Sequence, residues 1–215
     1  MTRERVRVRG SPRGAAPWER NVTDEALMRD VRDGEVSRLG LLFERYHAGL
    51  FEFFSRMLGD RPAADDLVQE VFIRILKYRR TYRDDGRFQT WMFHIARNVR
   101  NDHIRKRRPD QLTADMPEPA AAGADQAAAV EYAEDLVRLR RALLRLPDDR
   151  REVVVLARYH GMTHDEIAAD LRVEPGTVRV RLHRALKELR ALVQTMTTGE
   201  RTCDANKPSS GFRTF

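Results

Sequence analysis

Hydrophobic positions recur every three or four residues over most of this chain, a period that predicts amphipathic helices. The first helix is expected after the N-cap candidate Thr23 and should end at Gly34. A longer apolar period covers residues 35–58, where the aromatic residues follow the buried stripe and are expected in the core. Pro62 suits the first turn of the next helix. The pattern therefore predicts an all-α fold.

Two more helices are expected before the pattern stops. One covers residues 63–80 and has a complete apolar face; the other covers residues 88–108 and has an increasingly basic end. The loop between them has Asp85 and Gly86 as its turn signal. Helical periodicity is then lost across 109–129, a stretch of proline, alanine and acidic residues that is typical of a flexible linker.

This linker divides the chain into two small helical domains, expected at residues 21–108 and 130–195. The arginine-rich stretch 1–20 has no apolar period and is expected to be disordered. Residues 196–215 are poor in apolar side chains and are expected to form a disordered tail.

Residues 162–193 predict a helix-turn-helix in the second domain. Thr163 and Glu166 have the spacing of a capping box, in which each side chain satisfies a free backbone N–H at a helix start. A break at Arg172–Pro175 follows, and a longer helix then continues at helical period. The polar positions of this second helix are largely basic: Arg179, Arg181, His183, Arg184, Lys187 and Arg190.

A basic helix of this kind fits the major groove of DNA, where arginine can donate two hydrogen bonds to guanine. The alternative is a solvated charged surface with no partner. The formal net charge of +7 and the pI near 10 favour a polyanionic partner, and nucleic acid is the first candidate. The sequence has no apolar run that could span a bilayer and no secretory signal, so we expect a cytoplasmic protein without membrane insertion.

No constellation for catalysis, a metal or a cofactor is predicted. His160 and His164 have zinc-like spacing, but a helix boundary between them favours two surface histidines. Asp65, Asp66 and Glu70 lack the further ligands of a metal nuclease. A single cysteine, Cys203, cannot form an internal disulfide.

Two surfaces of the first domain suggest binding partners. Asp66, Gln69, Glu70 and Ile73 form a stripe opposite the apolar face, where an exposed isoleucine among acids would suit a basic helical partner. The aromatic loop near residues 82–91, followed by a basic helix, is typical of a surface on which unpaired bases stack and phosphates are held.

The chain resembles bacterial RNA polymerase sigma factors of the extracytoplasmic-function (ECF) type. Region two of that family is matched by DDLVQEVFIRI at Asp65–Ile75 and by the stretch Gly86–Arg108. Region four is matched by Leu146–Arg190, which includes the helix-turn-helix. Both motifs in this order are strongly specific, whereas the two ends of the chain and the linker lie outside the resemblance.

The resemblance implies roles for named residues, promoter DNA and core RNA polymerase as partners, and an anti-sigma factor as an inhibitor. The clamp coiled coil of polymerase would be bound by Asp66, Gln69, Glu70 and Ile73, and region four would also contact the polymerase flap. The minus-ten element would be bound by Tyr82, Arg83, Asp84, Arg87, Phe88, Trp91, His94, Arg97, Asn98 and Asn101. The minus-thirty-five element would be bound by Thr177, Arg179, Val180, His183, Arg184 and Lys187.

Two other functions remain open from the residues alone. A helix-turn-helix repressor or activator would explain the second domain but would leave the Ile73 stripe and the aromatic loop without a purpose. A DNA-processing enzyme such as a recombinase would need a nucleophile or a metal site, and the sequence offers neither.

Overall fold

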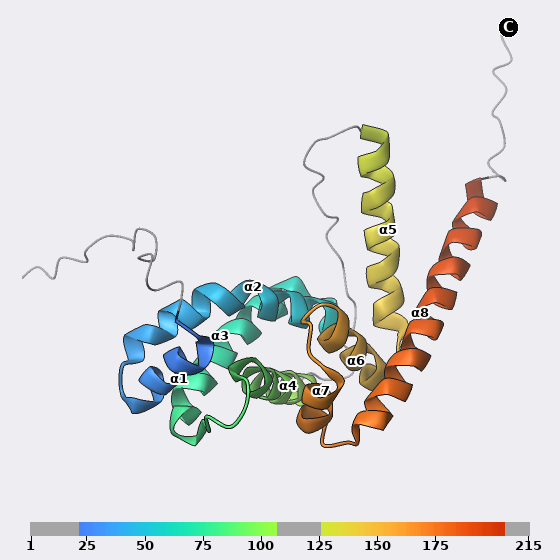
Figure 1. Cartoon of the computed structure of the whole chain (residues 1–215). Coiled ribbons are helices and arrows are strands. Elements are labelled where there is room, and N and C mark those ends of the chain that lie inside the picture. The colour runs from blue at the N-terminus through green and yellow to red at the C-terminus, as the bar shows by residue number, and fades with distance from the viewer. Residues whose placement is uncertain (1–21, 107–125, 205–215) are drawn as a thin grey trace, which may run out of the picture.

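The computed structural model describes residues 22–106 and 126–204. The basic extension 1–20, residues 109–125 of the expected linker and the final residues 205–215 lie outside the described residues. Within the described ranges all regular structure is helical, which confirms the predicted all-α class. Residues 22–106 are called the N-terminal unit below, and residues 126–204 the C-terminal unit (Figure 1).

The N-terminal unit has four α-helices, and short 3-10 turns at Val36–Arg38 and Arg79–Thr81. The helices are α1 (Asp24–Asp33), α2 (Leu39–Leu58), α3 (Arg61–Tyr78) and α4 (Phe88–Lys106). As predicted, the Thr23 side chain caps α1, accepting a hydrogen bond from the Ala26 N–H at 3.2 Å. Gly34 follows α1 with φ 123° and Gly59 follows α2 with φ 72°, conformations that favour glycine.

The C-terminal unit comprises α5 (Gln126–Arg145), α6 (Asp148–Arg158), α7 (His164–Leu171) and α8 (Pro175–Asp204). The capping box is formed as predicted, with the Glu166 carboxylate accepting from the Thr163 N–H at 2.7 Å and the Thr163 hydroxyl accepting from the Glu166 N–H at 3.2 Å. Arg172 ends α7 in the left-handed region, with φ 54°, and so turns the chain towards α8.

In the C-terminal unit two expected boundaries differ from the structure. The first helix of the C-terminal unit begins at Gln126 rather than near Val130, because alanine, the best helix former, fills most of the intervening positions. The last helix continues to Asp204, so residues 196–204 are helical and the tail expected from residue 196 is corrected over that range. The apolar stripe of α8 extends past the predicted end, since Met196 still packs against the core, as Leu192 and Val193 do before it.

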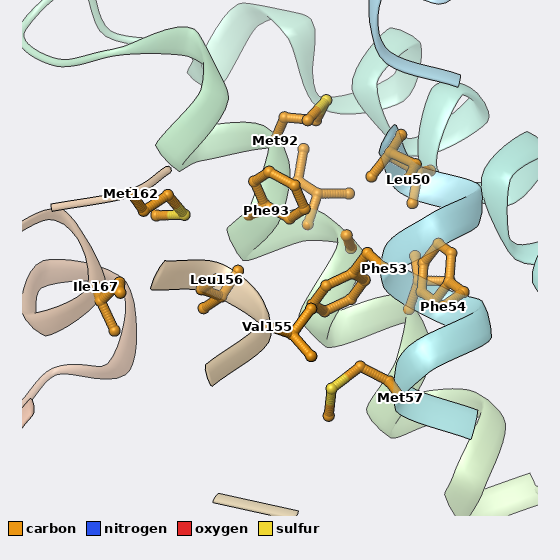
Figure 2. Close-up of a cluster of buried hydrophobic side chains, with 14 of the residues drawn as sticks. Leu50, Phe53, Phe54, Met57, Met92, Phe93, Val155, Leu156, Met162 and Ile167 are labelled. Atoms are coloured by element: carbon orange, nitrogen blue, oxygen red, sulfur yellow. The ribbon is translucent and has the colours of Figure 1, made fainter. Parts of the chain in front are cut away.

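One hydrophobic cluster joins the two units. Phe53 and Phe54 of α2 are buried beside Phe93 of α4, and Val155 of α6 lies close to them (Figure 2). Helices α2 and α4 contact α6 and α7, so the C-terminal unit packs directly on the N-terminal one. The outer parts of α5 and α8 extend away from this contact (Figure 1).

The expectation that the α2 aromatic residues lie in the core holds for Phe53 and Phe54 but not for Phe43. Phe43 is 40% exposed, with its ring stacked on His47 and its centroid 4.9 Å from that of Phe72. Position 43 is at the edge of the apolar stripe, where a ring can cover the core without being enclosed. No helix in the described ranges is long and apolar enough to cross a membrane.

Candidate nucleic-acid interface

The helix-turn-helix presents a basic surface on α8. Its inner side is fixed by buried Val178, Leu182 and Ala185, which pack on the core. Its outer side exposes the predicted residues Arg179, Val180, His183, Arg184 and Lys187, while Thr177 at the helix start is half-buried. Arg179, Arg184 and Lys187 form no ion pair with any other described residue, so their donors face solvent.

An open hollow of about 270 Å³ lies where the loop before α4 meets α7. Arg83, Gly86 and Trp91 line it from the N-terminal unit, and Ala169 and Asp170 complete it from α7. Most of its lining therefore comes from the segment for which single-stranded DNA binding was predicted.

Tyr82 and Phe88 are not on the surface of that segment. Phe88 is fully buried and Tyr82 is 3% exposed, and their rings pack edge to face. The Tyr82 ring also packs on Trp91, with centroids 5.2 Å apart. This corrects the interpretation of Tyr82 and Phe88 as direct DNA contacts. In this conformation the two rings pack beneath the surface and support the loop.

Three of the predicted minus-ten residues pair with acids of the C-terminal unit. Arg87 Nη1 lies 3.1 Å from the Glu166 carboxylate, and His94 Nδ1 lies 3.0 Å from Asp170. Arg97 Nε lies 3.5 Å from Glu152, and Arg97 Nη1 donates to the Asp170 backbone carbonyl at 2.8 Å.

The other predicted members of this set are more open. Arg83, Asn98 and Asn101 are exposed, although Asn101 accepts a hydrogen bond from Arg100 at 3.1 Å. The carboxylate of Asp84 pairs with Arg29 on α1 at 3.0 Å, which fixes the loop to the body of the N-terminal unit.

Most side chains of the predicted docking stripe on α3 are exposed. Ile73 is 60% exposed, and Asp66 and Gln69 lie on the surface beside it. Glu70 is less available, because Arg74 donates to its carboxylate at 2.7 Å and also to Asp102 of α4 at 2.8 Å.

Several interface residues were not predicted. Glu152 and Asp170 are buried carboxylates, and burial raises the pKa of each. The opposing charges are those of Arg100 and Arg97 for Glu152 and that of Arg97 for Asp170. Arg151 is buried too, donating to the Leu143 and Leu146 carbonyls at 2.9 Å and to the Met57 carbonyl of α2. The partners of Glu152 and Asp170 on α4 are more than fifty residues away in the sequence, so the positions of these acids gave no local signal.

The prediction that His160 is a surface histidine is wrong. Its ring centroid lies 4.5 Å from that of Phe93 and 5.9 Å from that of Phe53. Burial, and secondly the charge of Arg56, lower the pKa of His160 to about 4. In the described ranges no three histidine, cysteine or acidic side chains are grouped as metal ligands.

An exposed basic second helix on a helix-turn-helix defines the class: a DNA-binding protein. The sequence also matches two family profiles, "Sigma-70 region 2" over residues 42–109 and "Sigma-70, region 4" over residues 136–189.

Similar proteins are spread across bacteria. The chain is 33% identical over 173 residues to RNA polymerase sigma factor CarQ of Myxococcus xanthus, covering 77% of this chain and 95% of that protein. It is 31% identical over 189 residues to the ECF RNA polymerase sigma-E factor of Escherichia coli K12, covering 81% of this chain and 96% of that protein.

Solved structures agree with this similarity. CnrH, solved in complex with the cytosolic domain of CnrY, has a TM-score of 0.61 and 28% identity, covering 80% of this chain and 97% of that one. The sigma factor RpoE of Bartonella quintana, solved with the anti-sigma factor NepR, shares the fold with a TM-score of 0.58, 24% identity, and coverage of 72% and 96%.

The chain therefore belongs to the sigma-70 family of RNA polymerase sigma factors, and within it to the ECF type. As such it binds core RNA polymerase, directs it to specific promoters and helps to open promoter DNA. A helix-turn-helix repressor that acts without polymerase is not favoured. The relatives are sigma factors, which are not enzymes.

Proposed function

We propose that α8 reads the minus-thirty-five element through Arg179, His183 and Arg184, with Thr177, Val180 and Lys187 beside them. The observation that carries this assignment is the outer face of α8, where Arg179 and Arg184 are exposed and have no acidic partner in the described ranges. Guanidinium groups in that state can pair with guanine edges or with phosphates without first breaking an internal ion pair.

The minus-ten element is bound by the loop before α4 and by the outer face of α4. The hollow beside Trp91 offers an aromatic wall for an unpaired base, and Arg83 and Gly86 line the same space. Arg87, His94, Arg97, Asn98 and Asn101 then follow the strand along α4, and Asp84 holds the loop through Arg29. Tyr82 and Phe88 act indirectly, by supporting this surface.

Core polymerase is bound through the α3 stripe. Ile73 supplies apolar area, and Asp66 and Gln69 supply polar contacts around it for the clamp coiled coil. Glu70 contributes mainly by holding Arg74 in place. The C-terminal unit makes a second contact, with the polymerase flap.

The protein acts without a cofactor and without catalysis of its own, in the cytoplasm with the polymerase. An anti-sigma factor is its expected inhibitor, which is supported by the complex of the similar sigma factor RpoE with NepR.

A footprinting experiment tests these assignments. Holoenzyme assembled from the protein and core polymerase is bound to genomic fragments, and hydroxyl-radical protection and permanganate-reactive thymines are mapped. We expect protection near positions −35 and −10 and reactive thymines at the second site. Arg179→Ala should weaken binding by about 1–3 kcal/mol for a lost base contact, with loss of protection confined to the upstream site.

Arg158→Ala is the matched control, because Arg158 is an exposed arginine of the same unit that lies outside the helix-turn-helix. The two variants should therefore differ. Equal weakening by both, or loss of protection at both elements with Arg179→Ala, would contradict the assignment of α8.

A further inference from the structure

Helix α1 lies beside the loop before α4, residues 82–87, and contacts both ends of that region (Figure 1). Asp84, near the start of the loop, pairs with Arg29, and the N–H of Phe88, where α4 begins, donates to Glu25. We propose that Glu25 and Arg29 are positioning residues, which hold the loop in the conformation that captures the minus-ten element. This inference rests on the proposed binding of that element by the loop and α4.

The two contacts come from one side of α1. Glu25 and Arg29 are four residues apart, so their side chains are neighbours one turn apart on the helix surface. The Arg29 Nη1 lies 3.0 Å from the Asp84 carboxylate, and the Glu25 carboxylate accepts from the Phe88 N–H at 3.2 Å. A single helix therefore fixes two points of the chain that are four residues apart.

Helix α1 is itself fixed in the N-terminal unit. Three of its apolar side chains are fully buried in the core, those of Leu27, Met28 and Val31. At the start of the helix, the Asp24 carboxylate accepts from the Arg45 guanidinium and from the Tyr46 hydroxyl, both on α2. Movement of α1 with the loop would break these contacts. We infer that α1 sets the position of the loop, and not the reverse.

The loop needs support between its buried ends. Tyr82 and Phe88 are buried, whereas residues 83–87 are all exposed. Exposed segments with few packing contacts open easily. The first N–H groups of an α-helix also lack partners inside the helix, and Glu25 supplies an acceptor for that of Phe88. The contacts from α1 therefore select one of the conformations that the buried ends allow.

The position of the loop matters more here than the stability of the fold. The Arg29 and Asp84 side chains are 47% and 38% exposed, and ion pairs between exposed side chains contribute little to stability. Arg83 and Gly86, on either side of Asp84, line the hollow beside Trp91 that is proposed to receive an unpaired base. Release of Asp84 would therefore move one wall of this hollow while the unit stays folded.

Hydrogen–deuterium exchange tests this role without DNA. Uptake by peptides spanning residues 82–90 of the full chain is measured by mass spectrometry. Arg29→Asp removes the ion pair and sets like charges against each other, so exchange in this segment should become about tenfold faster. Asp84→Arg in the same chain restores an ion pair of reversed polarity, and should return the exchange rate to within about twofold of the unsubstituted chain.

Further variants test Glu25 and the effect of charge alone. Glu25→Ala removes the acceptor of the Phe88 N–H and should also speed exchange, whereas Glu25→Gln keeps an oxygen acceptor and should not. Arg32→Asp is the matched charge control, because Arg32 pairs with Asp33 inside α1, at 2.9 Å, and it should leave exchange unchanged. In variants that circular dichroism shows to be folded, unchanged exchange with Arg29→Asp, equal acceleration by Arg32→Asp, or failure of the reversed pair to slow exchange would overturn the role of α1. Equal exchange in Glu25→Ala and Glu25→Gln would remove Glu25 from it.

Promoter opening then connects α1 to the minus-ten element. Holoenzymes are bound to a promoter fragment recovered in the footprinting experiment and are treated with permanganate. Arg29→Asp should lower the reactivity of thymines in the minus-ten element by about tenfold, if roughly one loop in ten keeps the capturing conformation. Polymerase binding and upstream protection should not change, and the reversed pair should restore reactivity.

The two measurements separate this inference from the function on which it rests. Faster exchange in residues 82–90 with full permanganate reactivity would leave the contact of α1 with the loop standing and overturn the minus-ten assignment. A loss of reactivity that the reversed pair does not restore would mean that Arg29 contacts DNA itself, and would overturn its positioning role.

Discussion

Arg97 shows how one side chain can join the two units. It is 19% exposed, and its guanidinium reaches both Glu152 and the Asp170 carbonyl. The guanidinium N–H groups of Arg97 could donate to a DNA phosphate in the same way if Glu152 and Asp170 were not bound to them. The residue type was predictable from the basic face of α4, but its partners were not, because they lie more than fifty residues away in the sequence.

His160 gives a prediction at the same scale. Its pKa is lowered to about 4, so between pH 6.5 and 4 the unfolded protein takes up a proton that the folded protein does not. Acidification from pH 7 to 5 should therefore lower the free energy of unfolding by about 2 kcal/mol through this residue. Burial raises the pKa of Glu152 and Asp170, so these two carboxyl groups favour the folded protein as the pH falls, whereas His160 favours the unfolded protein.

The effect of His160 is isolated by comparison with His160→Phe, which keeps an aromatic ring beside Phe53 and Phe93. Urea unfolding at pH 7 and at pH 5 should show a smaller loss of stability in the variant. NMR titration of the His160 ring gives a direct reading. A midpoint near 6.5 would show that the ring is exposed in solution and would contradict its packing on Phe53 and Phe93.

At the scale of elements, caps determine where the helix-turn-helix begins. The reciprocal bonds between Thr163 and Glu166 fix the start of α7, which packs on α8. We expect Thr163→Ala to lower the free energy of unfolding by about 1 kcal/mol, the usual cost of a lost N-cap. Urea denaturation of the two proteins measures the difference.

Thr195→Ala is the matched control within α8, because the Thr195 hydroxyl only donates to the Ala191 carbonyl within the helix, at 2.9 Å. Alanine is the better helix former there, so this change should be neutral or slightly stabilising. Equal destabilisation by both substitutions would mean that the capping box contributes nothing particular to the fold.

The α3 helix leads to a prediction about polymerase. Ile73→Glu should leave stability within about 0.5 kcal/mol, because the side chain is largely exposed. If Ile73 is central to the docking stripe, binding to core polymerase should weaken by about 2 kcal/mol, or roughly thirtyfold. Affinity is measured by fluorescence anisotropy of the labelled protein.

Ile104→Glu provides the comparison, since Ile104 is an isoleucine of α4 that is 43% exposed and lies outside the stripe. Its polymerase affinity should not change. If Ile73→Glu and Ile104→Glu bind core polymerase with the same affinity, the stripe is not part of the docking surface.

For the whole molecule, sequence was a good guide to local structure and a poor guide to packing between units. Thr23, Gly34 and Thr163 act through neighbours a few residues away, and the predicted helix starts and ends were correct there. The burial of His160 and Asp170 depends on contacts with the other unit, so no local pattern encodes it. Exposure of Ile73, Arg179 and Arg184 followed directly from helical period.

Transcription in vitro tests the account most directly. The purified protein is added to bacterial core RNA polymerase with fragmented genomic DNA, and transcript starts are mapped by sequencing. We predict discrete starts only when protein and core polymerase are both present, with shared sequences near positions −35 and −10 upstream of them. Failure of core polymerase to bind the protein or to gain new starts would contradict the account.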